Sequence, residues 1–139
     1  MKVFYWSPHL SHVATVSAVI NSAVALCKYS QNTINSTIIN SIGEWDEYKN
    51  ELNKKKVNTI DIFSKKTFKH LPKYGFLKSR YSYWKIFLSS LFSLKNLLQQ
   101  EKPNYLIIHL ITSLPIVLNF LFNFDTKVIL RISGYPKLN

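Results

Sequence analysis

Cysteine is almost absent from this sequence. Cys27 is the single cysteine among 139 residues, so the chain has neither a disulfide framework nor a cysteine-based metal site. A lone thiol is compatible with a reducing compartment, and we expect Cys27 to be a small buried hydrophobe. No other cluster of residues has metal-ligand spacing, so we expect no metal.

Acidic residues and arginine are also scarce. Seven acidic residues face eighteen basic ones, and the formal net charge is +11. This imbalance indicates an anionic partner, which could be phosphates, nucleic acid or an acidic membrane surface. Arg80 and Arg131 are the only arginines, and the remaining bases are lysines. Lysine favours diffuse attraction over bidentate reading of bases, which disfavours sequence-specific nucleic-acid recognition.

Familiar catalytic motifs are missing too. The sequence contains no G-x-G-x-x-G after the first apolar run, no Walker sequence and no G-x-S-x-G. The seven acids offer no evident catalytic pair. Glu44, Asp46 and Glu47 cluster around Trp45, where we expect a solvated helix start. The catalytic residues are therefore unknown at this level.

The composition is that of a folded protein. Hydrophobic residues make up 47% of the chain and aromatic residues 14%, which excludes disorder, and 139 residues suit one domain. The N-terminus imitates a signal peptide, because no charge follows Lys2 until Lys28. Pro8, His9 and His12 interrupt its apolar run, so we interpret the segment as structure.

The uncharged residues 104–124 decide between two classes of protein. About 20 such residues could span a bilayer. Thr112, Ser113 and Pro115 interrupt the run, however, and divide it into a short apolar strand at 105–111 and a helix at 114–122. Thr112 or Ser113 can cap that helix, and its first turn accepts Pro115. With a strand at 127–132, the segment predicts a parallel βαβ unit. The alternative is an integral membrane protein with spans at 3–27 and 104–124.

The rest of the chain repeats this alternation. We predict strands at 2–6, around 37–39 and at 57–63, with Gly43 ending the second. We predict a helix through Cys27, a helical segment at 45–56, a loop or broken helix at 64–82 and a long amphipathic helix at 83–100. The predicted fold class is α/β: a doubly wound, mostly parallel Rossmann-like sheet of about five strands with helices on both faces, forming one domain over residues 1–139. Because the chain stops after an uncovered strand, we expect the front half of a longer protein or a truncated reading frame.

The fold predicts where a ligand would bind. In a parallel sheet with the order 3-2-1-4-5, ligands bind beyond the carboxyl ends of the strands, near the first and fourth. His9 and His12 each suit a surface position, but with the nearby helix N-terminus they suit an anionic or sugar ligand. The predicted cleft-lining residues are Ser7, Pro8, His9, His12, His109, Thr112, Arg131, Ser133 and Gly134.

Three of these residues have competing interpretations. His109 is either a core histidine bonded to backbone or a ligand-facing residue. Arg131 lies in an apolar strand, so we expect it to find an ion-pair partner or a crevice. Gly134 is either a cleft residue or an ordinary turn.

Residues 64–82 form a basic segment without an acid, interleaved with aromatic rings such as Phe68 and Tyr74. This pattern suits a segment resting on anionic headgroups, with cations outside and rings at the interface. The alternative is a solvated face. A nucleic-acid-binding surface is a further alternative, because the rings could stack on bases. The predicted membrane- or anion-binding residues are Lys65, Lys66, Lys69, Lys73, Lys78 and Arg80.

Three stretches carry a resemblance to a known family: the opening MKVFYWSP with its small-residue helix, the strand PNYLIIHL, and the closing VILRISGYPKLN. Together they resemble the N-terminal domain of GT-B glycosyltransferases, in the family 4 group that builds bacterial surface polysaccharides. By position, residues 7–12 match the family's first-strand loop, His109 the polar residue ending the fourth strand, and residues 131–134 the segment facing the domain cleft. The family's first loop is usually glycine-rich, whereas this one has Pro8, His9 and His12.

The resemblance implies a function. The N-terminal half binds the acceptor, and the C-terminal half, missing here, binds the sugar nucleotide and carries paired glutamates. We therefore expect an enzyme that transfers a sugar from a nucleotide-sugar donor to a lipid-linked or saccharide acceptor, at the cytoplasmic face of the membrane. We expect no cofactor and no activity from this chain alone. The alternative is a small basic protein that binds nucleic acid or membranes without enzymatic activity, although nucleic acid is the less favoured partner.

Overall fold

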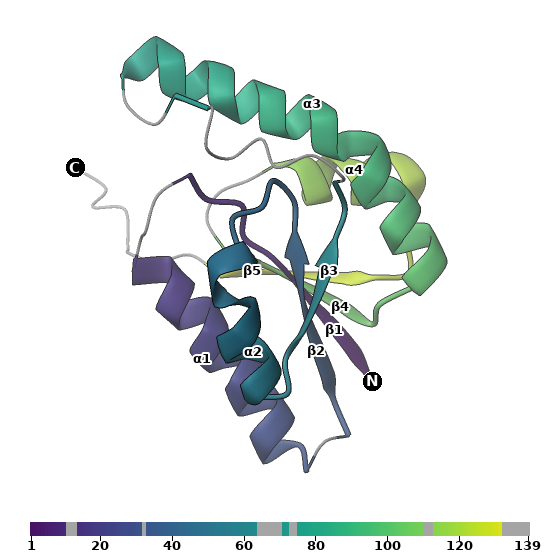
Figure 1. Cartoon of the computed structure of the whole chain (residues 1–139). Coiled ribbons are helices and arrows are strands. Elements are labelled where there is room, and N and C mark those ends of the chain that lie inside the picture. The colour runs from purple at the N-terminus through teal and green to yellow at the C-terminus, as the bar shows by residue number, and fades with distance from the viewer. Residues whose placement is uncertain (11–13, 32, 64–70, 73–74, 110–112, 132–139) are drawn as a thin grey trace, which may run out of the picture.

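The structure, a computed structural model, describes residues 1–10, 14–31, 33–63, 71–72, 75–109 and 113–131. Five strands form one parallel sheet in the order β3-β2-β1-β4-β5. Figure 1 shows this sheet with helices on both sides. The predicted doubly wound α/β fold is confirmed. The elements are β1 (Lys2–Trp6), α1 (Ala14–Tyr29), β2 (Asn35–Asn40), the 3-10 helix η1 (Asp46–Tyr48), α2 (Lys49–Lys54), β3 (Asn58–Asp61), α3 (Phe76–Glu101), β4 (Tyr105–His109), α4 (Leu114–Phe122) and β5 (Lys127–Arg131).

Strand β1 is the centre of the sheet. Phe4 pairs with Thr37 of β2 on one side and with Leu106 of β4 on the other. Because every pair is parallel, all five strands end at the same edge. At that edge His109 of β4 is paired with Arg131 of β5.

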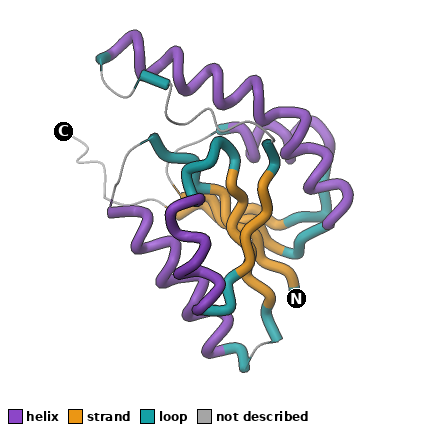
Figure 2. The backbone as a smooth tube through the Cα atoms, viewed as in Figure 1, coloured by secondary structure: helices purple, strands orange, loops and turns teal. Residues whose placement is uncertain are grey.

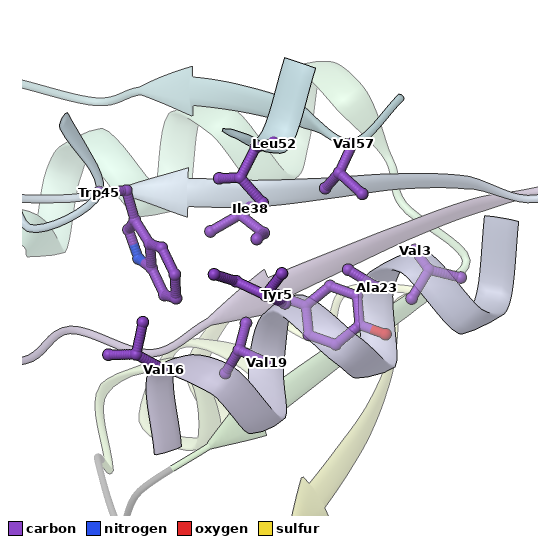
Figure 3. Close-up of a cluster of buried hydrophobic side chains, with 10 residues drawn as sticks. Val3, Tyr5, Val16, Val19, Ala23, Ile38, Trp45, Leu52 and Val57 are labelled. Atoms are coloured by element: carbon purple, nitrogen blue, oxygen red, sulfur yellow. The ribbon is translucent and has the colours of Figure 1, made fainter. Parts of the chain in front are cut away.

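Helices α1 and α2 cover one face of the sheet. Val16, Val19 and Ala23 recur along α1 at helical spacing, so they face the sheet together. They meet Tyr5 of β1 and Ile38 of β2, as Figure 3 shows. Leu52 of α2 and the loop residue Trp45 complete this first core, and neither side chain is accessible to solvent.

Helices α3 and α4 cover the opposite face, as Figure 2 shows. Leu94 and Leu98 of α3, with Leu118 of α4, form a second core with the sheet residues Trp6 and Ile108. Alternation along β1 explains how one short strand serves both layers, because successive side chains point to opposite faces. The sheet is therefore buried on both faces at its centre.

The predicted punctuation of residues 104–124 is confirmed. Strand β4 is followed by α4, whose first turn contains Pro115 and whose end is the left-handed Asn123, with φ of 46°. The residues that a membrane span would need are thus divided between a strand and a helix. Among the described residues, no helix is both long and apolar enough to cross a membrane.

We predicted a loop or broken helix at 64–82, and from Phe76 onward this segment is instead part of one continuous helix. Helix α3 begins at Phe76, directly after Gly75, whose φ of 94° marks the turn into the helix. The Ser82 hydroxyl donates to the Pro72 carbonyl at 2.7 Å, and this contact ties the incoming chain to the helix. Lys78 and Arg80 are therefore helical. The other predicted anion-binding residues, Lys65, Lys66, Lys69 and Lys73, lie outside the described residues.

Candidate functional site

The carboxyl ends of the strands bring distant residues to one edge. Trp6, which precedes Ser7, is paired with Ile108, which precedes His109. Ser7, His9 and His109 therefore share the edge with Arg131 of β5. Of the predicted cleft residues, His12, Thr112, Ser133 and Gly134 lie outside the described part of the chain.

His109 is buried, with 2% of its surface exposed. Its ring lies beside Tyr5, with 6.0 Å between ring centroids. Its Nε2 atom is enclosed and has no hydrogen-bond partner within the described residues. Burial, and secondarily the positive charge of Arg131, lowers the pKa of His109 to about 4. His109 is therefore a neutral imidazole at pH 7, and its Nε2 atom is unpaired as far as the described chain extends.

Tyr5 does not supply that hydrogen bond. Its hydroxyl lies 3.0 Å from the Ser22 hydroxyl of α1. Burial raises the pKa of Tyr5, which keeps the phenol protonated. Tyr5 therefore packs against the His109 ring while its polar end is engaged elsewhere.

His9 is buried rather than on the surface, which corrects the sequence-based expectation. Its exposed fraction is 7%, and its ring meets the edge of the Trp45 indole with 5.0 Å between centroids. Nδ1 lies 3.1 Å from the Ser7 carbonyl oxygen. Because a carbonyl only accepts, Nδ1 carries the proton. The partner indole comes from the loop after β2, so no local signal around His9 indicated this packing.

Glu44 is a buried residue that sequence reasoning placed on a solvated helix start. Its carboxylate accepts hydrogen bonds from the backbone N–H groups of Ser41, at 3.1 Å, and Ile42, at 2.7 Å. The Ser41 hydroxyl donates a third, at 2.8 Å. Burial raises the pKa of Glu44, and these hydrogen bonds oppose that shift. The available signal was Gly43, whose φ of 90° permits the tight reversal.

Asn40 holds the same loop from the end of β2. Its Oδ1 accepts the Trp45 backbone N–H at 3.1 Å, and its Nδ2 donates to carboxylates of Asp46 and Asp61. Lys49 bridges both carboxylates, at 3.0 Å and 2.7 Å, and its hydrogen bond to Asp61 raises the pKa of Lys49. Within the described ranges, no group of His, Cys, Asp and Glu could hold a metal ion. The hydrogen bonds of Asn40 and the ion pairs of Lys49 therefore hold the loop that carries Trp45.

Arg131 is exposed, and none of the ion pairs among the described residues includes it. The expected partner or crevice is therefore not found there. The physical reason is its strand: β5 is an edge strand, on which Ile129 and Leu130 are also exposed. A charge at the end of such a strand stays in water, and Arg131 acts on His109 through its charge.

Ser113 does not cap α4 through its side chain. It is the N-cap residue, but its hydroxyl lies 2.6 Å from the Tyr83 hydroxyl of α3 and makes no capping hydrogen bond. The contact fixes the start of α4 against α3, at the carboxyl edge of the sheet. The predicted capping role is therefore replaced by a bond between two helices.

A separate hollow of about 430 Å³ lies at the opposite edge, near the amino ends of β1, β2 and β3. Its walls carry amide and hydroxyl side chains, among them Asn35, Asn58 and Thr59. The Lys2–Glu101 ion pair, at 2.9 Å, borders it. Strand carboxyl ends do not reach this hollow, so it is distinct from the candidate cleft.

These features define a Rossmann-like α/β domain with a polar carboxyl edge. The fold is similar to that of a UDP-GlcNAc 2-epimerase from Neisseria meningitidis, solved bound to UDP-GlcNAc, with a TM-score of 0.59 and 18% sequence identity. The likeness covers 100% of this chain and 34% of that chain, so this chain spans about a third of the neighbour's length. At this identity the likeness shows a shared Rossmann-like fold. No family model and no curated protein matches the sequence.

Proposed function

We propose that this chain is the acceptor-binding N-terminal domain of a GT-B glycosyltransferase. The complete enzyme would transfer a sugar from a nucleotide-sugar donor to a saccharide or lipid-linked acceptor, at the cytoplasmic face of a membrane. A second, C-terminal domain would bind the donor, and this chain alone would not catalyse transfer. Support comes from the shared fold with a protein solved bound to a nucleotide sugar, and from the family resemblance of the strand ends.

The observation that carries the proposal is that the buried Nε2 atom of His109 has no hydrogen-bond partner in the described part of the chain. A buried polar atom without a partner costs free energy, so it calls for an explanation, and a functional role is one of the recognised ones. His109 lies at the end of β4, beside β1, where parallel sheets of this order bind ligands. Its neutral ring suits a hydroxyl-bearing ligand better than an anionic one.

The lowered pKa of His109 supports one role for this residue over another. A base with a pKa of about 4 removes protons poorly at pH 7, so general-base catalysis is not its strength. A hydrogen bond between Nε2 and an acceptor hydroxyl would instead orient the sugar. His109 would then be a substrate-positioning residue, and the acid–base group would come from elsewhere.

Histidine-ring NMR tests the acceptor role on the 139-residue chain. The four histidines are assigned by single His→Gln substitutions, and the probes are p-nitrophenyl glycosides of glucose, galactose and N-acetylglucosamine, with UDP-GlcNAc as the donor probe. We expect at least one glycoside to shift the His109 signals saturably, and His109→Gln to abolish its binding. No response to any glycoside would contradict an acceptor site. A response to UDP-GlcNAc alone would assign donor binding to this domain.

An isomerase is the second candidate, favoured by the epimerase with the same fold. An epimerase changes the sugar of its nucleotide substrate and needs no acceptor. A protein carrying this chain and a second domain distinguishes the two by product analysis. Transfer requires a glycoside as acceptor and releases a nucleoside diphosphate. Isomerisation proceeds without a glycoside and yields an altered sugar.

A further inference from the structure

Helix α3 has two apolar sides. One side contains Leu94 and Leu98 and packs against the sheet. The other side is exposed and recurs at every third or fourth residue, the spacing of one helical face. We refer to this second side as the outer stripe; it consists of Leu77, Tyr81, Trp84, Leu88 and Phe92, each more than half exposed.

Helix α4, which packs beside α3, also exposes apolar side chains. Phe120 is 86% exposed and Leu121 is 62% exposed. Lys95 of α3 stands over the Phe122 ring, with Nζ 4.1 Å from its centroid, and joins the two helices. Figure 1 shows α3 along the outside of the molecule with α4 beside it. Contiguous exposed apolar surface of this kind commonly marks an interaction site.

Cations accompany the outer stripe. Arg80 lies over the Phe76 ring at 4.2 Å, and Lys85 lies near the Tyr81 ring at 5.9 Å. Lys78 and Lys85 lie on the same flank of the stripe, seven residues apart. Residues 76–100 contain no acid. The surface is therefore apolar with a one-signed positive border.

This charge pattern selects among occupants. A second copy of the chain, docked through the same surface, would bring two positive borders together without acids to offset them. An anionic lipid surface instead offers phosphates to the cations and a boundary region to the aromatic rings. Lysine and arginine near such a surface are each attracted by about 1 kcal/mol. No described helix is suited to crossing the bilayer, so docking would be interfacial.

We propose that the outer stripe of α3, with the exposed end of α4, docks on an anionic lipid membrane. The helix lies in the interface with Trp84 and Phe92 among the acyl-chain boundary and Lys78, Arg80 and Lys85 at the headgroups. The surface is separate from the candidate cleft and does not depend on the proposed sugar chemistry. It also does not involve the undescribed residues 64–70.

Tryptophan fluorescence provides a direct test, because the three tryptophans differ in environment. Trp6 and Trp45 are buried, with 1% and 0% exposed, whereas Trp84 is 56% exposed. A shift of the emission to shorter wavelength on adding vesicles therefore reports on Trp84. We expect this shift with vesicles of phosphatidylcholine and phosphatidylglycerol, and little with phosphatidylcholine alone. Trp84→Phe should keep vesicle binding and abolish the shift.

Co-sedimentation with the same vesicles measures affinity. The double variant Leu88→Ser/Phe92→Ser should bind at least about tenfold more weakly, because two side chains no longer enter the interface. The matched control is Tyr29→Ser. Tyr29 is an exposed aromatic residue beside a lysine, Lys28, but it lies on α1 across the sheet. Its substitution should leave binding unchanged, and circular dichroism should show both variants folded.

Four outcomes would overturn the proposal. They are absence of vesicle binding, equal binding to neutral vesicles, unchanged binding of the double variant, and a Trp84 shift that follows protein concentration without lipid. The last result would assign the surface to a second copy of the chain, and sedimentation velocity would show the dimer. None of these outcomes affects the binding of glycosides measured by histidine-ring NMR, so failure of the membrane proposal is distinguishable from failure of the proposed function.

Discussion

His9 meets the edge of the Trp45 indole, with the two ring planes at 85° and their centroids 5.0 Å apart. The contact joins the loop after β1 to the loop after β2, at the carboxyl edge where the candidate cleft lies. Edge-to-face pairs of this kind contribute about 0.5–1.5 kcal/mol beyond their burial. The Trp45 indole therefore helps to set the shape of this edge, together with the strands.

Removing the indole should destabilise the protein strongly. We expect Trp45→Ala to lower the free energy of unfolding by about 4 kcal/mol, because a fully buried ring leaves a cavity. Trp45→Phe should cost only about 1–2 kcal/mol, because the indole Nε1 has no hydrogen-bond partner within the described residues and its loss is not penalised. Urea denaturation measures both. Equal losses for the two variants would contradict a packing role.

The Glu44 carboxylate should be a structural acceptor. In Glu44→Gln, an amide N–H₂ replaces one carboxylate oxygen and faces the backbone donors of Ser41 and Ile42. We expect a loss of about 2 kcal/mol in unfolding free energy. The matched control is Glu51→Gln, whose carboxylate forms an exposed ion pair with Lys55 and should cost under about 0.5 kcal/mol. A similar, small loss of unfolding free energy in both variants would show that the Glu44 carboxylate does not stabilise its loop.

His109 should make stability fall in mild acid. Its folded pKa of about 4 is below the ordinary 6.5, so between these values the unfolded state binds more protons. The stability from this residue is complete above about pH 6.5 and is lost as the pH falls towards 4, by up to about 3 kcal/mol. The raised pKa of Glu44 acts in the opposite direction, stabilising the fold as the pH falls.

The difference between wild type and His109→Gln isolates the histidine. Urea midpoints are compared at pH 4.5 and pH 7.5, where the Glu44 contribution is common to both proteins. We expect wild type to lose more stability than the variant on acidification. Parallel curves would show that the environment of His109 in the folded chain does not lower its pKa.

Asn40 should matter more than the ion pairs around it. Asn40→Ala leaves the Trp45 backbone N–H without its acceptor, in a buried position, and we expect a loss of about 2 kcal/mol. Lys49→Ala removes ion pairs to Asp46 and Asp61 that remain partly in water, and it should cost under about 1 kcal/mol. Thermal unfolding ranks the two variants. A greater loss for Lys49→Ala would show that charge, rather than the amide, holds the loop.

Local signals explain which elements could be predicted. The bounds of α4 follow from Pro115 in its first turn and Asn123 at its end, both of which can be recognised in the local sequence. The central strands could be predicted because they are short and apolar, as strands covered on both faces are. The start of α3 could not be predicted, because the Lys-rich sequence around Pro72 and Gly75 is typical of a loop. The contact that holds the first turns of the helix, from the Ser82 hydroxyl to the Pro72 carbonyl, is visible only in the structure.

The candidate site was predictable in position but not in environment. Strand alternation and the order β3-β2-β1-β4-β5 placed Ser7, His9, His109 and Arg131 at one edge. Whether each would be buried depended on partners far along the chain. His9 needed Trp45, and His109 needed Tyr5. Arg131 had no such partner among the described residues and stayed exposed.

By itself, then, the sequence determined the fold class, the alternation of strands and helices and the excess of positive charge, because these follow from residue type and spacing along the chain. Only the tertiary structure decided that Glu44 turns inward, that the Nε2 atom of His109 has no hydrogen-bond partner among the described residues, and that one side of α3 is exposed there. Whether a side chain is buried depends on which other elements pack over it, and these come from distant parts of the chain. The sheet has room for one side of α3, so the second apolar side is left in contact with solvent.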